Sequence, residues 1–337
     1  MTPSEATMRA VQVQQYGDPE VMKVVDLPPP VPGPGELVVD VAVADVIFLD
    51  ALLRGGGGEG WGMSTPYVGG GAVAGTVAAV GVGVDPARIG ERVVARSGTQ
   101  GAYAERVAVA DVLAVALPDE VGDEEAAALS RDGVTALRLL DVTRVGAGDR
   151  VLVNAATGGC GALVVQAALE RGATVVGAAR GERKLALVRE LGAEAVDYSL
   201  PGWTEKVVAA LGGQPPTVLL DGAGGTPGQE AFTVLADGGR LVAYGAAGGF
   251  LEPDEREVRR RGLQVDGIAG VQLADEDIRA LTVQALEMLR GGRWSPVIRQ
   301  RYPLDAAADA HRGLEERTAI GKTLLVVAPL VPEVNNR

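Results

Sequence analysis

The chain has 337 residues, a length typical of two domains with enough mass for a large core. It carries 31 Lys and Arg against 44 Asp and Glu, a formal net charge of −13, so we expect no nucleic acid partner. One cysteine excludes an internal disulfide, and one cysteine with one histidine makes a catalytic zinc site implausible, so we expect no metal. No apolar run reaches the length of a membrane span and the first residues lack a signal-peptide core, so we expect a cytoplasmic protein without a membrane partner.

Short strand-like runs separated by turns occupy the first third of the chain. They span residues 8–16, 21–27, 36–46, 72–81, 91–97 and 102–110. The proline-rich connection at residues 28–36 cannot be a central strand. This pattern predicts a mostly antiparallel β domain, which we assign to residues 1–118 and 272–337, with a loose tail over the first seven residues.

The pattern changes near residue 119. Residues 119–143 carry apolar side chains at helical spacing, with acidic residues near the start. From residue 150 onward strand-like and helical runs alternate, which predicts an α/β fold with a doubly wound parallel sheet. We therefore expect an α/β domain over residues 119–271, inserted between the two parts of the β domain. After it we expect a helix near residues 275–292, an Ala-rich helix, and a final strand from residue 321.

The most informative segment joins the strand-like run 150–156 to the helix that follows it. It reads Thr157-Gly158-Gly159-Cys160-Gly161. Glycines let the backbone turn tightly and let a diphosphate approach the main chain, while the helix N-terminus holds the negative charge. The segment lacks the full G-x-G-x-x-G motif, so its weight comes from the strand–loop–helix–strand context within about 30 residues. A structural turn in an α/β protein without a cofactor is the alternative.

The next strand-like run ends at Arg180, where an NAD enzyme usually has Asp or Glu to hold the ribose 2′-hydroxyl. Arg183 and Lys184 follow, and a guanidinium fits a 2′-phosphate that a carboxylate would repel. The sequence therefore predicts NADPH. Glu182 in the same run leaves NADH open, and these charged residues are alternatively a solvated helix start. We interpret Cys160 as a small packing residue beside the cofactor and expect His311 at the surface or at a helix cap.

These motifs resemble the zinc-independent quinone oxidoreductase branch of the medium-chain dehydrogenase/reductase (MDR) superfamily. The resemblance extends over residues 8–328 and rests on segments 16–39, 101–109, 132–140, 148–168, 182–198, 218–225, 238–249 and 302–326. It implies an alcohol dehydrogenase-like oxidoreductase with a GroES-like β domain for substrate and a Rossmann domain for NADPH. It also implies a homodimer.

The resemblance implies a cofactor site spread over many loops. The residues that it implies are Thr135, Tyr244, Gly245, Ala246, Ile268, Ala269 and Gly270 near the nicotinamide, Thr157, Gly158, Gly159, Cys160 and Gly161 at the diphosphate, Arg180, Lys184 and Tyr198 around the 2′-phosphate, and Gly222 and Lys322, the latter closing over the cofactor.

The chain departs from the family in the substrate domain. Relatives usually read G-V-N-x-x-D-x-Y where this chain has residues 45–52. Ile47 replaces an asparagine that touches nicotinamide and substrate, and Leu52 replaces a tyrosine proposed as proton donor in enoyl reductases. Ala72 replaces a glutamate. The pocket should therefore be more apolar than in relatives and fit a flat hydrophobic acceptor.

The resulting hypothesis is an NADPH-dependent reductase whose small hydrophobic substrate is a quinone or an α,β-unsaturated carbonyl, with hydride supplied by the nicotinamide. The polar candidates for catalysis are Asp50, Tyr67 and Arg131, together with Arg54, and each has a structural role as its alternative. Two other functions remain open. One is a tailoring enoyl or enone reductase of a polyketide-like pathway, and the other is an NADPH-binding sensor with little catalytic activity.

Overall fold

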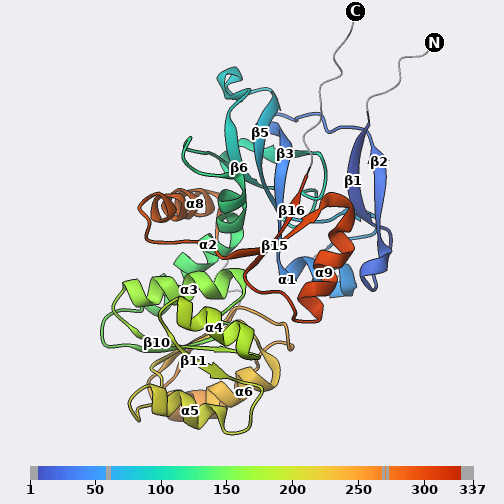
Figure 1. The fold of residues 1–337 in the computed structure, drawn as a ribbon. Coiled ribbons are helices and arrows are strands. Elements are labelled where there is room, and N and C mark those ends of the chain that lie inside the picture. Colours follow the sequence, from blue (N-terminus) through green and yellow to red (C-terminus); the bar gives the residue numbers. More distant parts are fainter. Residues whose placement is uncertain (1–6, 58–61, 268–269, 271–272, 328–337) are drawn as a thin grey trace, which may run out of the picture. The chain divides into compact units, whose positions relative to one another are not determined.

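The computed structural model describes residues 7–57, 62–267, 270 and 273–327 (Figure 1). The chain forms two compact units: the first comprises residues 1–131, 275–286 and 298–337, and the second comprises residues 132–274 and 287–297. Helix α2 (Asp123–Thr143) begins in the first unit and continues in the second. The sequence predicts the domain boundary at residue 119, because the helical pattern begins there. The two units instead divide between residues 131 and 132, and no local pattern inside a regular helix signals such a boundary.

The first unit is built on two sheets. A seven-stranded sheet has the order β15-β16-β3-β5-β6-β8, with β7 also paired to β3, and a three-stranded sheet has the order β2-β1-β4. All pairings are antiparallel except that of β15 with β16. The strands are β1 (Met8–Val13), β2 (Met22–Leu27), β3 (Glu36–Val46), β4 (Tyr67–Val68), β5 (Ala72–Val80), β6 (Arg92–Arg96), β7 (Arg106–Ala110), β8 (Ala114–Ala116), β15 (Ile298–Pro303) and β16 (Lys322–Val326).

Strand β3 is the centre of the larger sheet. Its sequence ELVVDVAVADV is rich in Val, and most of its residues are buried, because it pairs with β5, β7 and β16. Its last residues lead into the short helix α1 (Phe48–Leu52). Helix α9 (Ala307–Glu315) and the early part of α8 (Asp275–Arg290) complete this unit.

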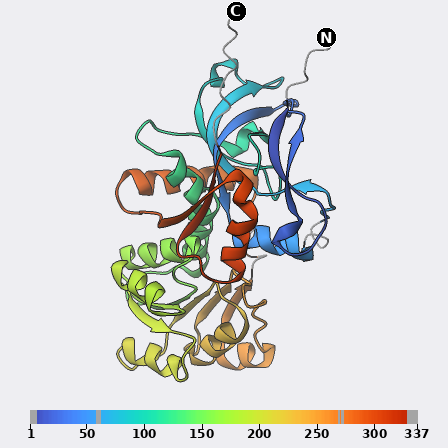
Figure 2. The same cartoon turned by 45° about the vertical axis from the view of Figure 1, so that its right-hand side comes forward.

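The second unit has a six-stranded parallel sheet of order β11-β10-β9-β12-β13-β14, as expected for a doubly wound fold. Its strands are β9 (Arg150–Asn154), β10 (Thr174–Ala179), β11 (Glu194–Asp197), β12 (Val218–Asp221), β13 (Arg240–Ala243) and β14 (Gln264–Gly267). Its further helices are α3 (Gly159–Glu170), α4 (Glu182–Glu190), α5 (Trp203–Ala210), α6 (Gly225–Val234) and α7 (Glu255–Arg261). Helices α3 and α4 lie on one side of the strands, and α5 and α6 on the other (Figures 1 and 2).

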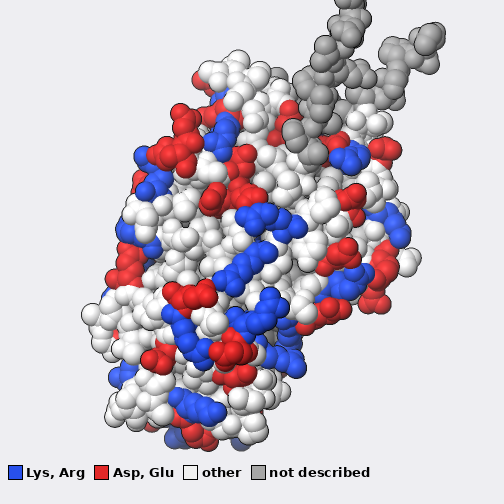
Figure 3. Space-filling view, in the orientation of Figure 1, with Lys and Arg blue, Asp and Glu red and all other residues white. Residues whose placement is uncertain are grey.

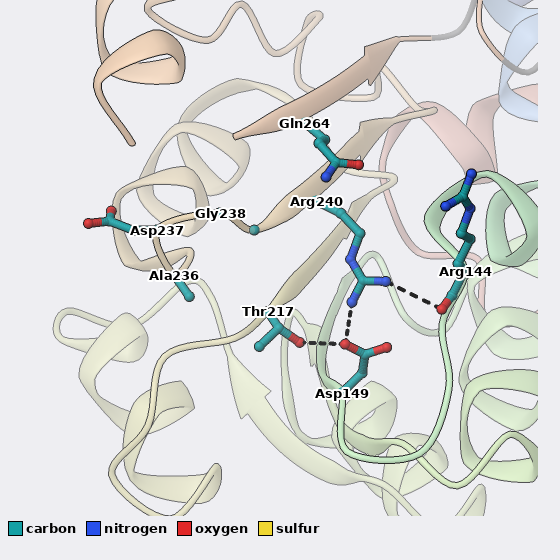
Figure 4. Close-up of a pocket in the computed structure, with 9 residues that line it drawn as sticks. Arg144, Asp149, Thr217, Ala236, Asp237, Gly238, Arg240 and Gln264 are labelled. Atoms are coloured by element: carbon teal, nitrogen blue, oxygen red, sulfur yellow. Dashed lines mark hydrogen bonds and ion pairs between the residues drawn. The ribbon is translucent and has the colours of Figure 1, made fainter. Parts of the chain in front are cut away.

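A polar pocket of about 440 Å³ lies at the amino ends of β9, β12, β13 and β14 (Figure 4). The Arg240 guanidinium there pairs with Asp149 and donates to the carbonyls of Thr143 and Arg144 at the end of α2. The Thr217 hydroxyl donates to the same Asp149 carboxylate over 2.9 Å. These groups satisfy one another, so we interpret the pocket as a structural junction between α2 and the sheet.

Replacing Arg240 with methionine should lower the free energy of unfolding by about 1–3 kcal/mol, because Asp149 and two helix-end carbonyls lose their donor. Urea unfolding followed by circular dichroism measures the change. Nucleotide affinity should stay unchanged, because the pocket lies at the opposite edge of the sheet from the glycine loop. An Arg240→Met variant of wild-type stability would contradict this role.

No described helix is long and apolar enough to cross a membrane. On the face drawn in Figure 3, Lys and Arg side chains are interspersed with Asp and Glu side chains.

Candidate functional site

The carboxyl ends of the six parallel strands meet at one edge of the second unit. Most of the cofactor residues implied by the sequence follow these strand ends directly: Thr157 to Gly161 after β9, Arg180 after β10, Tyr198 after β11, Gly222 after β12, Tyr244 to Ala246 after β13, and Gly270 near the end of β14. Ligands of open α/β sheets bind at this edge. Thr135 lies on α2, Lys184 on α4, and Ile268 and Ala269 lie outside the described residues.

The glycine loop brings the start of α3 close to the end of β9. A Cβ on Gly161 would lie 2.3 Å from the Ala155 carbonyl oxygen, so only glycine permits this close packing of helix against loop. Gly158 is the exposed N-cap of α3, and its nearest neighbour would be 3.6 Å away from a Cβ. The loop is therefore packed on its inner side and open at the helix N-terminus, where backbone N–H groups can bind an anion.

The loop after β10 presents Arg180 to solvent. The carboxylate of Asp197 accepts from the Gly181 N–H at 3.0 Å and from the Ser199 N–H at 2.8 Å. Burial raises the pKa of Asp197, but these hydrogen bonds and the charge of Arg180 together lower it. Among the described residues Arg180 makes no hydrogen bond or ion pair, so its guanidinium is available to an anionic ligand.

The loops after β12 and β13 pack backbone against backbone. A Cβ on Gly245 would lie 2.2 Å from the Gly222 carbonyl oxygen, and a Cβ on Gly222 would lie 2.6 Å from the Tyr244 hydroxyl. Asp221 holds the first loop, accepting from the Ala223 N–H at 3.1 Å and from the Asn154 side-chain amide at 3.0 Å. Burial raises the pKa of Asp221, although these hydrogen bonds act to lower it.

Among the residues that the structure describes, the buried Tyr244 hydroxyl finds no hydrogen-bond partner. Burial raises its pKa well above the usual value, and the nearby Cys160, Asp221 and Asp132 reinforce the shift. Buried hydroxyl groups in native proteins are normally hydrogen-bonded, so this one marks a place where a ligand atom would complete the site. Of these neighbours, Cys160 lies in the glycine loop, Asp221 at the end of β12 and Asp132 on α2.

A second constellation lies in the first unit, where β3 ends. Arg131 bridges two buried carboxylates: its Nε lies 2.9 Å from Asp45, and its terminal nitrogens lie 2.8 Å from Asp50. Lys322 Nζ lies 3.0 Å from Asp45. Burial raises the pKa of Asp45, but the charges of Arg131 and Lys322 outweigh it and lower the pKa. In this unit the Lys322 ammonium thus pairs with Asp45.

The network continues from Asp50 to His311. The Tyr103 hydroxyl lies 3.0 Å from Asp50 and 3.1 Å from His311 Nε2, and Arg54 Nε donates to His311 Nδ1 at 3.4 Å. Arginine always donates, so Nδ1 is the acceptor, Nε2 carries the proton, and Tyr103 donates to Asp50. His311 is 1% exposed, so the expectation of a surface or capping histidine is wrong. It is buried because α9 packs against α1, a contact without a local sequence signal.

The remaining catalytic candidates are also embedded in this unit. Arg54 is 1% exposed, donates to the Gly17 carbonyl and pairs with Glu315. Burial, with the charge of Asp50, raises the pKa of Tyr67 to about 12. Asp50 also accepts from the Ile47 N–H at 2.9 Å, and so fixes the start of α1. Together with Arg131, these residues hold the α1 segment in place.

His311 makes stability depend on pH. Burial lowers the pKa of His311 to about 4 from 6.5. Above pH 6.5 the folded and unfolded chains both hold it neutral; below pH 6.5 only the unfolded chain takes up the proton, so stability falls until about pH 4, by roughly 3 kcal/mol in total. The difference in unfolding free energy between wild type and His311→Gln, measured by urea titration at pH 7 and pH 4, should shrink by that amount. Parallel pH profiles for the two proteins would contradict this assignment.

The buried carboxylate of Asp45 stands where the family pattern has glycine, and Ala72 stands where it has glutamate. The pairing of Ala44 with Val73 places Asp45 beside Ala72 on adjacent strands. The chain thus has its buried acid one strand away from the position that relatives use. Both departures are visible in the sequence, but their proximity depends on the strand register, which only the structure provides.

Within the described residues, no group of three or more His, Cys, Asp and Glu side chains comes together that could hold a metal ion.

Comparison with known proteins agrees with this architecture. The family model described as alcohol dehydrogenase GroES-like domain matches residues 33–119, and the one described as zinc-binding dehydrogenase matches residues 159–287. The quinone oxidoreductase of Sus scrofa is 30% identical over 97% of this chain and 100% of its own. A mycobacterial protein solved with NADPH has 32% identity and a TM-score of 0.87, covering 95% of this chain and 99% of its own. The Escherichia coli quinone oxidoreductase solved with NADPH has 26% identity and a TM-score of 0.87, covering 94% and 99%.

Two family models together match more than half of the chain, and full-length relatives reach 30% identity or more. The chain therefore belongs to the quinone oxidoreductase branch of the medium-chain dehydrogenase/reductase superfamily.

Proposed function

We propose that the protein is an NADPH-dependent oxidoreductase that reduces a quinone or an α,β-unsaturated carbonyl. The observation that most supports NADPH as the cofactor is the exposed Arg180, which lies directly after the strand that follows the glycine loop. Two solved relatives that contain NADPH support it. The relatives named quinone oxidoreductase support the acceptor class.

The residues of the second unit have separate roles in this proposal. The N–H groups at the start of α3 bind the diphosphate, and Arg180 binds the 2′-phosphate. The Tyr244 hydroxyl gains a partner when the site is filled. NADPH supplies hydride, which with one proton from water converts a quinone to a hydroquinone and leaves NADP⁺.

In the first unit, Arg131 and Asp50 act as positioning residues. Through the Ile47 N–H, Asp50 fixes the segment in which Ile47 and Leu52 replace the polar residues of relatives. Apolar side chains at these two positions favour a flat apolar acceptor. The proton then comes from water rather than from a side chain at position 52.

The test is a fluorescence titration of the purified protein with NADPH and NADH, followed by NADPH consumption with a panel of quinones and enones. We expect binding of NADPH and turnover with acceptors of one of these classes. Binding without turnover on any acceptor would favour an NADPH sensor, a second candidate supported by the loss of polar side chains at Ile47 and Leu52. A lack of affinity for both nucleotides would refute both functions.

We also propose a homodimer formed through β14. This strand is the last in the six-stranded sheet and has mostly exposed residues, so its outer edge offers backbone groups for pairing. Light scattering should give a mass of twice the 34.5 kDa chain. A monomer at micromolar concentration would contradict this assembly.

A further inference from the structure

Arg96 is a partly buried arginine at the end of β6, in the first unit. Among the described residues it makes no hydrogen bond and no ion pair, although its guanidinium carries five donors. Within the part of the chain that the structure describes, none of its guanidinium nitrogens is among the buried atoms without a partner, so solvent and ligands can reach the group. Arg96 therefore offers accessible donors to an anionic ligand.

The strand register shows what surrounds it. Ala72 on β5 lies directly opposite Arg96, and Asp45 on β3 lies beside Ala72 on its other side. Residues opposite one another on adjacent strands point to the same face of a sheet. The three side chains therefore form a row, in which the small, fully buried Ala72 separates the carboxylate from the guanidinium.

Charged side chains of both signs lie near this row. Arg131 and Lys322 are both bound to Asp45, and Arg131 also to Asp50, so these two carboxylates are already engaged by other cations. Arg96 adds a further positive charge. Burial and the charge of Arg131 lower the pKa of Arg96, while Asp45 and Asp275 oppose the shift without forming an ion pair with it.

The position of Arg96 in the sheet relates its guanidinium to the proposed acceptor site. Strand β3 ends at Val46, β5 begins at Ala72 and β6 ends at Arg96, so the row lies where these three strands share one end. The chain leaves β3 at this end and enters the segment with Ile47 and Leu52, which the proposed function places at the acceptor. The Arg96 guanidinium, which has no partner among the described residues, thus belongs to the same strand ends as the segment with Ile47 and Leu52.

We propose that Arg96 binds an oxyanion group of the substrate, a carboxylate or a phosphate, carried on the apolar acceptor. This inference rests on the proposed reductase function and narrows its substrate class to acidic quinones or enones. A planar guanidinium binds such groups with two parallel charge-assisted hydrogen bonds.

The experiment compares three acceptors: a neutral naphthoquinone, the same ring with a carboxylate side chain, and an enoyl thioester with a phosphorylated carrier group. Arg96→Gln and Arg96→Lys are measured beside wild type. The control is Arg106→Gln, which removes one positive charge from β7, where Arg106 pairs with Asp40. Melting temperatures establish that each variant is folded.

We expect wild type to prefer an acidic acceptor over the neutral one at least tenfold in kcat/KM. The ratio should fall at least tenfold in Arg96→Gln, recover partly in Arg96→Lys and stay at the wild-type value in Arg106→Gln. The acceptor that shows the preference identifies carboxylate or phosphate as the bound group. An equal kcat/KM for neutral and acidic acceptors in wild type, or an unchanged ratio in Arg96→Gln, would overturn the proposal.

A binding measurement separates this inference from the proposed function. Calorimetric titration with naphthalene carboxylate and with neutral naphthalene methanol requires no turnover. Tighter binding of the carboxylate by wild type than by Arg96→Gln supports the oxyanion site even if no acceptor is reduced. Equal affinities would refute the site and leave the reductase function standing.

Discussion

Replacing Arg180 with glutamate should weaken NADPH binding about 100-fold, equivalent to about 2.7 kcal/mol. Arg180 is exposed after β10 and has no partner among the described residues, so its guanidinium is available to a 2′-phosphate. Glutamate removes the charge-assisted hydrogen bonds and adds repulsion between like charges. NADH lacks the phosphate and should bind Arg180→Glu at least as well as wild type, since a carboxylate there can accept from the ribose 2′-hydroxyl.

Fluorescence titrations with both nucleotides measure the effect. The matched control is Arg189→Glu, which makes the same charge change at another exposed residue, in the last turn of α4. It should weaken NADPH much less, because only general electrostatics change there. Equal losses for NADPH and NADH in Arg180→Glu, or no loss, would show that this residue does not hold the phosphate.

Removing the buried acid at position 45 should have the largest effect on stability. Asp45→Ala leaves Arg131 and Lys322 buried without this carboxylate, which should lower the free energy of unfolding by about 3–5 kcal/mol. Ala72→Glu alone adds a buried carboxylate beside Asp45 and should also destabilise the protein. Combined, the two substitutions exchange acid and alanine between adjacent strands, and a large part of the loss should be recovered.

The geometry supports this recovery. Ala72 points to the same face of the sheet as Asp45, and Arg131 binds the Asp45 carboxylate, so a glutamate at position 72 would have this cation within reach. Urea unfolding of wild type, both single variants and the double variant measures the coupling free energy, which should be at least about 2 kcal/mol. Additive losses in the double variant would mean that the two positions do not share the Arg131 charge.

The sequence predicts the regular elements well where hydrophobic periodicity is long. Strand β3 and helices α3 and α8 lie where the pattern predicted them. Helix α6 was missed, because its first residues, Gly-Thr-Pro-Gly, are typical of a loop, although proline is tolerated in the first turn of a helix. Strand β4 has only two residues, too few for a period to show.

The two halves of the site differ in how far the sequence could predict them. The proposed cofactor edge depends on local order along the chain, since each loop follows its own strand, so motifs alone can place its residues at the strand ends. The network in the first unit depends on contacts between residues far apart: His311 meets Arg54 across 257 positions. No local sequence pattern near either residue predicts this contact. The position of Arg96 opposite Ala72 likewise could not be predicted, because it depends on the strand register.

A crystal structure of the protein grown with NADPH tests the central claim most directly. We predict the diphosphate on the N–H groups at the start of α3, between Gly158 and Gly161, and the 2′-phosphate within hydrogen-bond distance of Arg180. We also predict that the Tyr244 hydroxyl acquires a partner. A nucleotide bound elsewhere, or crystals in which millimolar NADPH leaves this edge of the sheet unliganded, would contradict the account.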